Sequence, residues 1–281
     1  MNELEIQKFW NEHPCGDVHM GGIQPYLGDY EKFFSDYDRY RYRKEGHILR
    51  CLDQIDFRGK HILEIGLGQG ADSEQIIRRG GLWSGIDLTP ESVERVRTRF
   101  SLRQLSYQSL KQGSVLKIPF DDHTFDIIFS HGVLHHVPDV ESAQREMHRV
   151  LKSGGELIVM VYAKWSLNYL LSIYAVRRLG LMALFLTHYN PGGIFGQHLA
   201  NAREMGLWHY LEMKNFIHKN TDGPLNPYSR VYGLREVRRD FPNFEIVRCH
   251  KHFMHAPPLP VGWLPLEGLL GWHLWVHMKP I

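Results

Sequence analysis

A glycine-rich segment follows a short apolar run and precedes a helical pattern; it reads Glu64-Ile65-Gly66-Leu67-Gly68-Gln69-Gly70. Glycine lets the backbone turn tightly and approach a ligand, which then lies near the amino terminus of the following helix. Asp87 ends the next apolar run, 21 residues after Gly66. A carboxylate at that position can accept hydrogen bonds from both hydroxyls of a ribose. Because both features fall at expected strand ends, they indicate an adenosine-containing ligand rather than a purely structural turn.

These glycines alone do not identify the class of enzyme. Gly66, Gly68 and Ala71 also fit the G-x-G-x-x-G/A pattern of nicotinamide dinucleotide enzymes. Three downstream segments distinguish the classes: Ser114-Val115-Leu116-Lys117-Ile118-Pro119-Phe120, then Phe125–Asp139 with Ser130-His131 and His135-His136, and finally Arg149–Gly155.

With these segments in this order, the stretch from about Lys60 to Tyr162 resembles the class I S-adenosylmethionine (SAM)-dependent methyltransferases. It is most similar to the group that contains the ubiquinone/menaquinone C-methyltransferases and many natural-product methyltransferases. The resemblance implies a Rossmann-like fold, SAM as cofactor and a small-molecule acceptor. Two positions depart from the family pattern: Ser114 stands where aspartate is common, and Ser153 replaces the proline of the K-P-G-G turn.

The resemblance also implies which residues hold the cofactor. The expected contacts are Glu64, Gly66, Gly68 and Gly70 to the methionine part, Asp87 to the ribose, Leu88, Ser114 and Val115 around the adenine, and Ser130 and His131 near the sulfonium. A further contact is expected from the alternating tyrosines and arginines of Tyr37–Arg43. Arg43 is the candidate there, because a guanidinium can bind both oxygens of a carboxylate. The alternative is that this segment is a solvated helix face.

Two adjacent histidines are the candidate catalytic residues. Methyl transfer requires a nucleophile in line with the sulfonium methyl, exclusion of water and management of one proton. Histidine is the natural base near neutral pH, and His135 and His136 follow a strand at the mouth of the expected site. The alternative is that the pair only shapes the loop. Adjacent histidines point in different directions on most backbones, so no metal site is expected.

The elements that position these residues alternate between apolar runs and helical patterns. Strands are expected at His61–Ile65, Leu82–Asp87, Leu105–Gln108, Phe125–Ser130, Glu156–Tyr162, Phe244–Met254 and Trp272–Met278. Helices are expected at Asp72–Arg79, Pro90–Phe100, Val140–Leu151 and Leu234–Asp240. This alternation predicts an α/β fold, a doubly wound Rossmann-like sheet of seven strands. No helix separates the last two strands, so the last strand is expected to run antiparallel.

Four regions follow along the chain. Residues 1–55 are expected to form an N-terminal arm and helical cap, irregular over 1–30 and helical from Glu31 to Gln54. Residues 56–162 form the SAM-binding core, and residues 163–232 a helical lid, inserted between the fifth and sixth strands, that binds the acceptor. Residues 233–281 complete the sheet.

The composition restricts the partners and the compartment. A formal net charge of +2 does not indicate a nucleic-acid protein. The three cysteines form no CxxC pair, so neither a disulfide framework nor a structural zinc site is expected. The polar N-terminus shows no signal peptide, which predicts a cytoplasmic protein. The apolar stretch Leu167–Leu186 carries Arg177 and Arg178 at its middle, which favours a packed or membrane-surface helix over a transmembrane segment.

The combined prediction is a methyltransferase acting on a small molecule, with the apolar stretch suggesting an apolar acceptor. Three alternatives remain. An RNA or protein methyltransferase would have an open, basic cleft. A SAM-binding protein without methyl transfer would form no methylated product. A nicotinamide dehydrogenase would bind NADH.

Overall fold

The computed structural model describes residues 2–281 of the chain. Seven strands form one sheet in the order β3-β2-β1-β4-β5-β7-β6. Their bounds are β1 His61–Ile65, β2 Leu82–Asp87, β3 Ser109–Gln112, β4 Phe125–His131, β5 Leu151–Tyr162, β6 Phe244–His252 and β7 His273–Pro280. The first five strands pair in parallel, and β7 runs antiparallel to both β5 and β6. The predicted fold class, including the reversed last strand, is confirmed.

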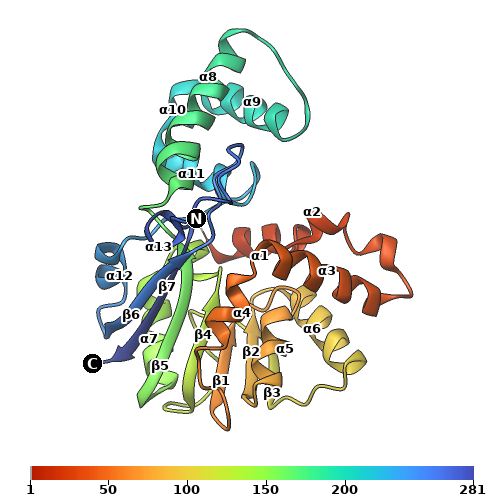
Figure 1. Cartoon of the computed structure of the whole chain (residues 1–281), viewed down its shortest axis with the longest axis vertical. Coiled ribbons are helices and arrows are strands. Elements are labelled where there is room, and N and C mark those ends of the chain that lie inside the picture. The colour runs from red at the N-terminus through yellow and green to blue at the C-terminus, as the bar shows by residue number, and fades with distance from the viewer. Residues whose placement is uncertain (1) are drawn as a thin grey trace.

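Helices cover both faces of this sheet (Figure 1). The helices that alternate with the strands are α5 Ala71–Arg78, α6 Pro90–Leu102, α7 Val140–Val150 and α12 Leu234–Asp240. Alternate residues of β5 belong to different core clusters, Leu157 and Val159 to one and Ile158 and Met160 to the other. A strand buried on both faces needs apolar residues at successive positions, which explains the continuous apolar runs in the sequence.

Local signals set the helix boundaries. The Thr89 hydroxyl accepts a hydrogen bond from the Ser92 amide, and Pro90 occupies the first turn of α6. The third strand was predicted at Leu105–Gln108, and this is wrong by four residues. The amide of Leu105 still donates to the Phe100 carbonyl at the end of α6, so the chain straightens only afterwards.

The N-terminal region is more regular than predicted. It contains α1 Glu3–Glu12, α2 Asp17–Met20, a 3-10 turn Gln24–Tyr26, α3 Tyr30–Lys44 and α4 His47–Leu52. Residues 1–30 were expected to be irregular, but Asn2 and Glu5 form a capping box that starts α1. The expected continuous helix Glu31–Gln54 is divided between α3 and α4.

The chain leaves the sheet after β5 and forms a separate group of helices. These are a π-helix at Asn168–Arg177, α8 Arg178–Leu186, α9 Gly193–Met205, α10 Leu207–Leu211 and α11 Met213–Thr221. They share their own apolar cluster, which includes Ile173 and Tyr210 and reaches Trp272 next to β7. Figure 1 shows them gathered beyond the end of the sheet at which β5 ends. A short helix, α13 Glu267–Leu270, lies between β6 and β7.

One helix of this group meets the length and hydropathy of a membrane span. It runs from Asn168 to Leu186 with a mean hydropathy of 1.5, and 17% of its most apolar stretch is buried. The guanidinium of Arg177 donates to the carbonyl oxygens of Pro257 and Asn220. These bonds tie the middle of the helix to the rest of the chain.

Candidate active site

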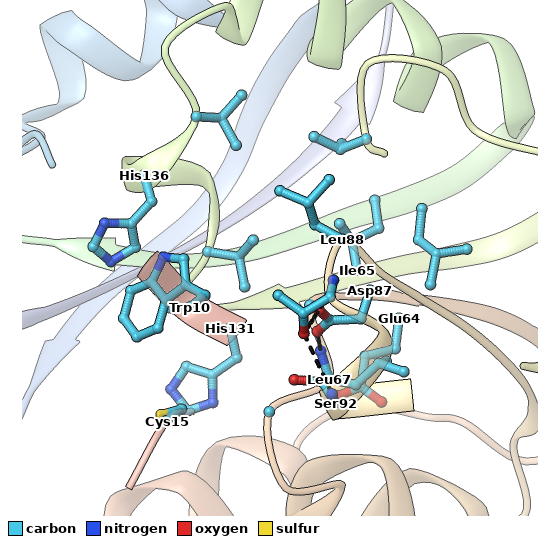
Figure 2. A pocket seen from close by; sticks show the side chains of 18 of the residues that line it. Trp10, Cys15, Glu64, Ile65, Leu67, Asp87, Leu88, Ser92, His131 and His136 are labelled. Atoms are coloured by element: carbon cyan, nitrogen blue, oxygen red, sulfur yellow. Dashed lines mark hydrogen bonds between the residues drawn. The ribbon is translucent and has the colours of Figure 1, made fainter. Parts of the chain in front are cut away.

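A cavity of about 220 Å³ lies at the carboxyl ends of β1, β2 and β4. Its floor is formed by the loops that follow these strands. Its cover comes from the N-terminal region, which contributes Ile6, Trp10, Tyr37 and Arg41. Figure 2 shows Trp10 and His136 on one side of this pocket and Glu64 and Asp87 on the other.

The glycine loop after β1 forms part of the pocket wall. Gly66 and Gly68 line the cavity and have φ angles of 79° and 52°, a region in which L side chains are strained. A Cβ atom at Gly66 would also lie 2.2 Å from Val133 Cγ2, so a larger residue cannot fit. Gly70 lies behind the wall, where it precedes α5 and packs against Val96 and Arg99.

Asp87 ends β2 and is buried at the edge of the cavity. Its Oδ2 accepts from the Leu67 amide at 2.7 Å, and its Oδ1 accepts from both the amide and the hydroxyl of Thr89. A carboxylate offers about four acceptor positions, so these three bonds leave one on Oδ2. Burial raises the pKa of Asp87 against the lowering effect of its hydrogen bonds.

Glu64 lies beside the glycine loop, and the pKa of its carboxyl group is strongly raised. The indole N–H of Trp83 donates to Glu64 Oε2 at 2.6 Å. Burial in this site raises the pKa of Glu64 to about 8. The carboxyl group is therefore largely protonated at neutral pH. It would lose its proton when a positively charged ligand binds beside it.

Arg41, Asp72 and His131 form a polar cluster at the pocket wall. Arg41 Nη2 donates to Asp72 Oδ2 at 2.7 Å, and His131 Nδ1 lies 2.5 Å from the same oxygen. Because an ionised carboxylate only accepts, His131 Nδ1 donates and cannot also accept from Arg41. Burial raises the pKa of Asp72, but Arg41 and His131 lower it by more. The pKa of Asp72 is therefore below its usual range.

The arginine in the pocket is Arg41 rather than the predicted Arg43. The Arg43 side chain is exposed and is absent from the described pocket lining. Residues two apart in a helix point in nearly opposite directions, whereas residues four apart share a face. The buried Tyr37 lies four residues before Arg41, and this spacing is the signal that separates the two arginines.

Two predicted serines also lie outside the described pocket lining. The Ser130 hydroxyl is fully buried and donates to the Ile65 carbonyl at 3.1 Å, which joins β4 to β1. The Ser114 hydroxyl is hydrogen-bonded to the carboxylate of Glu3, and it is Glu3 that lines the cavity. Leu88 and Val115 do line it, close to the end of β2.

The two candidate histidines occupy different positions. His136 lines the cavity, and its Nδ1 lies 2.7 Å from the Tyr228 carbonyl oxygen. A carbonyl only accepts, so Nδ1 carries the proton and Nε2 is the basic nitrogen. Nε2 lies 3.5 Å from Asp222 Oδ2. His135 is fully buried against the Tyr162 ring, outside the described lining, and burial lowers its pKa well below the usual range.

Sequence reasoning missed the helix α1 and the positions of Glu3 and Ile6 in the pocket. Glu3, Ile6 and Trp10 line the cavity from this helix, and the Trp10 ring lies 5.0 Å from the His136 ring. Asn2 followed three residues later by Glu5, just before apolar residues, is the capping-box pattern that could have indicated the helix.

Comparisons with known proteins bear on the central part of the chain. Residues 63–159 match the family described as "Methyltransferase domain". A demethylmenaquinone methyltransferase of Staphylococcus epidermidis is 30% identical over 149 residues, which is 53% of this chain and 56% of that protein. The uncharacterized protein YafE of Escherichia coli is 37% identical over 95 residues, 34% of this chain and 46% of that protein.

The chain spans between 25% and 56% of the length of the curated relatives it matches. Among solved structures, a SAM-dependent methyltransferase from Aquifex aeolicus is similar with a TM-score of 0.53 and 16% identity. That likeness covers 90% of this chain and 99% of the other, and at this identity it shows the fold. Residues 63–159 thus match the methyltransferase domain family, and the solved structure shares the fold of the chain.

Proposed function

We propose that the chain is a SAM-dependent methyltransferase that transfers a methyl group by in-line displacement to a small, largely apolar molecule. The observation that supports this most is the cavity at the ends of β1, β2 and β4, where the glycine loop, Asp87 and Arg41 meet. Bound SAM would supply an electrophilic methyl group there.

The residues present fit the charged part of this cofactor. Arg41 Nε and Asp72 Oδ1 are buried and have no hydrogen-bond partner among residues 2–281. A buried polar atom without a partner is costly, so a ligand that pairs with both is favoured. The carboxylate of an amino acid suits Arg41 and its ammonium suits Asp72. The remaining acceptor position of Asp87 Oδ2 would receive a ribose hydroxyl.

The cover of the pocket supports a small acceptor over a polymer. Helix α1 places Ile6 and Trp10 across the cavity. Arg41 is the one lysine or arginine side chain in the described lining, and it is paired with Asp72. An RNA methyltransferase would instead need an open cleft with several cations facing the phosphates.

His136 is the side chain we assign as the base. Its Nε2 and the Asp222 Oδ2 that faces it are both buried, and neither has a hydrogen-bond partner in the described part of the chain. Nε2 would bind a hydroxyl or acidic group of the acceptor molecule and take its proton. Asp222 lies outside the described pocket lining and would act through His136. The Tyr162 hydroxyl donates to Asp222 Oδ1 at 2.7 Å and so holds this carboxylate in place.

The helical segment after β5 supports an apolar acceptor and contact with a membrane surface. Exposed apolar side chains occupy α8 and α9, including Leu179, Leu186, Ile194 and Phe195. Such exposure costs free energy in water and is typical of surfaces that meet lipid or another apolar partner. We infer that this segment rests on the lipid surface in which an apolar acceptor dissolves.

Calorimetric titration of SAM and S-adenosylhomocysteine tests the donor site. We expect binding by the wild type and a loss of at least tenfold in Asp87→Asn, with no change in Asp121→Asn, an exposed aspartate. No binding to folded wild type would overturn the proposal, and NADH would then be titrated.

If SAM binds, incubation with SAM labelled in its methyl group and a lipid extract should yield a labelled product. Binding without any product would favour a SAM-binding protein that does not transfer methyl groups.

A further inference from the structure

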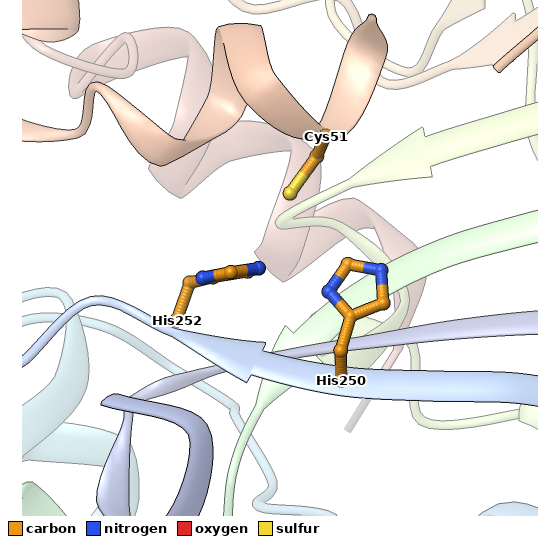
Figure 3. A group of neighbouring side chains, drawn as sticks. All are labelled: Cys51, His250 and His252. Carbon is orange, nitrogen blue, oxygen red and sulfur yellow. The ribbon is translucent and has the colours of Figure 1, made fainter. Parts of the chain in front are cut away.

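A second group of metal-ligating side chains lies away from the pocket, between α4 and β6. Cys51 projects from α4 toward His250 and His252 of β6 (Figure 3). One ligand atom from each residue lies within 4.8 Å of the other two. His250 and His252 are two apart in a strand, so they share a face. Three residues from two elements thus converge on one point.

The polar atoms of this cluster lack partners. Both ring nitrogens of His250 and Nδ1 of His252 are buried without a hydrogen-bond partner among residues 2–281. A neutral imidazole has one donor and one acceptor, and in a buried site both are normally paired. The neighbouring His277 is unavailable to His250, because its nitrogens are bonded to Glu156 and Arg248.

The ligand types select a class of metal. A thiolate with two imidazoles suits zinc, which binds cysteine sulfur and histidine nitrogen in tetrahedral sites. Magnesium and calcium prefer oxygen ligands. The carboxylate of Glu267 lies beside the cluster, with its Oε1 3.4 Å from both His252 Nδ1 and Arg50 Nη2. A carboxylate this close to the cluster favours a bound cation.

We propose that this cluster binds one zinc ion through Cys51 Sγ and one ring nitrogen each of His250 and His252, with water as the fourth ligand. As the zinc–sulfur bond forms, the thiol proton passes to solvent, because the thiolate is the ligand. The ion joins α4 to the sheet at β6, and so fastens the N-terminal region that covers the pocket. This inference is independent of the proposed methyl transfer.

The test uses the full chain after dialysis against a chelator. We expect one equivalent of zinc to bind and to raise the melting temperature by roughly 5–10 °C at about a hundredfold excess over Kd. Cobalt(II) should report the ligand set, with a sulfur-to-cobalt charge-transfer band and the visible bands of a tetrahedral site.

Matched variants separate the cluster from incidental binding. Cys51→Ser should lose the sulfur-to-cobalt charge-transfer band. His252→Asn should no longer bind one equivalent of zinc. Cys249→Ser should retain both, because Cys249 is an exposed neighbour of His250 that lies outside the cluster. If Cys51→Ser does not fold, the partly exposed His252 provides the second variant. Absence of zinc binding in the folded wild type, or equal binding by His252→Asn, would overturn the proposal.

Discussion

Arg41 Nη2 lies 2.7 Å from Asp72 Oδ2, and this ion pair joins α3 of the N-terminal region to α5, the helix that follows the glycine loop. Both side chains are largely buried at the pocket wall. The N-terminal region therefore contributes a charged group to the site and does more than cover it.

Replacing Arg41 should weaken SAM binding selectively. In Arg41→Lys the charge remains but the planar fork is lost, so we expect affinity to fall roughly tenfold to hundredfold, the effect of one or two charge-assisted hydrogen bonds. Calorimetry would measure the loss, with thermal unfolding to confirm that the variant is folded. Arg43→Lys is the matched control on the exposed side of the same helix. Equal effects of the two changes would refute the role of Arg41.

Binding of SAM should release a proton from Glu64. With a pKa of about 8, this carboxyl group is mostly protonated in the free protein at pH 7. The positive charges of SAM favour the carboxylate and lower that pKa, so binding releases close to one proton and affinity rises with pH up to about 8. Calorimetry at pH 7 in phosphate and in Tris, whose ionisation enthalpies differ, counts the protons. Glu64→Gln should release none; a release as large as that of the wild type would assign the proton to another group.

The base assignment predicts different results for the two histidines. Once the labelled-methyl screen has identified an acceptor, His136→Asn should lower kcat by roughly 10²–10⁴-fold, the usual contribution of a general base. The affinity for SAM should change little. His135→Asn should mainly lower the melting temperature, because that ring is buried against Tyr162. A kcat of His136→Asn that stays within threefold of the wild type would remove His136 from the mechanism.

Vesicle flotation tests the membrane contact of the helices after β5. We expect the wild type to float with phosphatidylcholine vesicles and the double variant Leu179→Asp with Ile194→Asp to remain in the soluble fraction. Burying an aspartate in lipid costs free energy, so two such substitutions should be enough to prevent binding to the vesicles. Leu102→Asp changes an exposed leucine on α6 and should float like the wild type. If the wild type itself does not float, the exposed apolar face has another role.

The local sequence determined much of the sheet and of the donor loop. The bounds of β1, β2 and α12 agree with the predicted ranges, because apolar runs, prolines and glycines act within a few residues. The positive φ angles of Gly66 and Gly68 likewise follow from a loop that only glycine can form. The reversed β7 followed from the absence of a crossover helix, since parallel strands need one.

The tertiary structure decided which side chains meet. Helix phase turned Arg41 toward the pocket and Arg43 toward solvent, while Ser130 became a link between β4 and β1. Chain folding brought α1 over the cavity from more than 50 residues before the glycine loop. It also placed Cys51 beside His250, across 199 positions of sequence. Spacing rules read neighbours along the chain, whereas these contacts depend on the direction of side chains and on packing between distant elements.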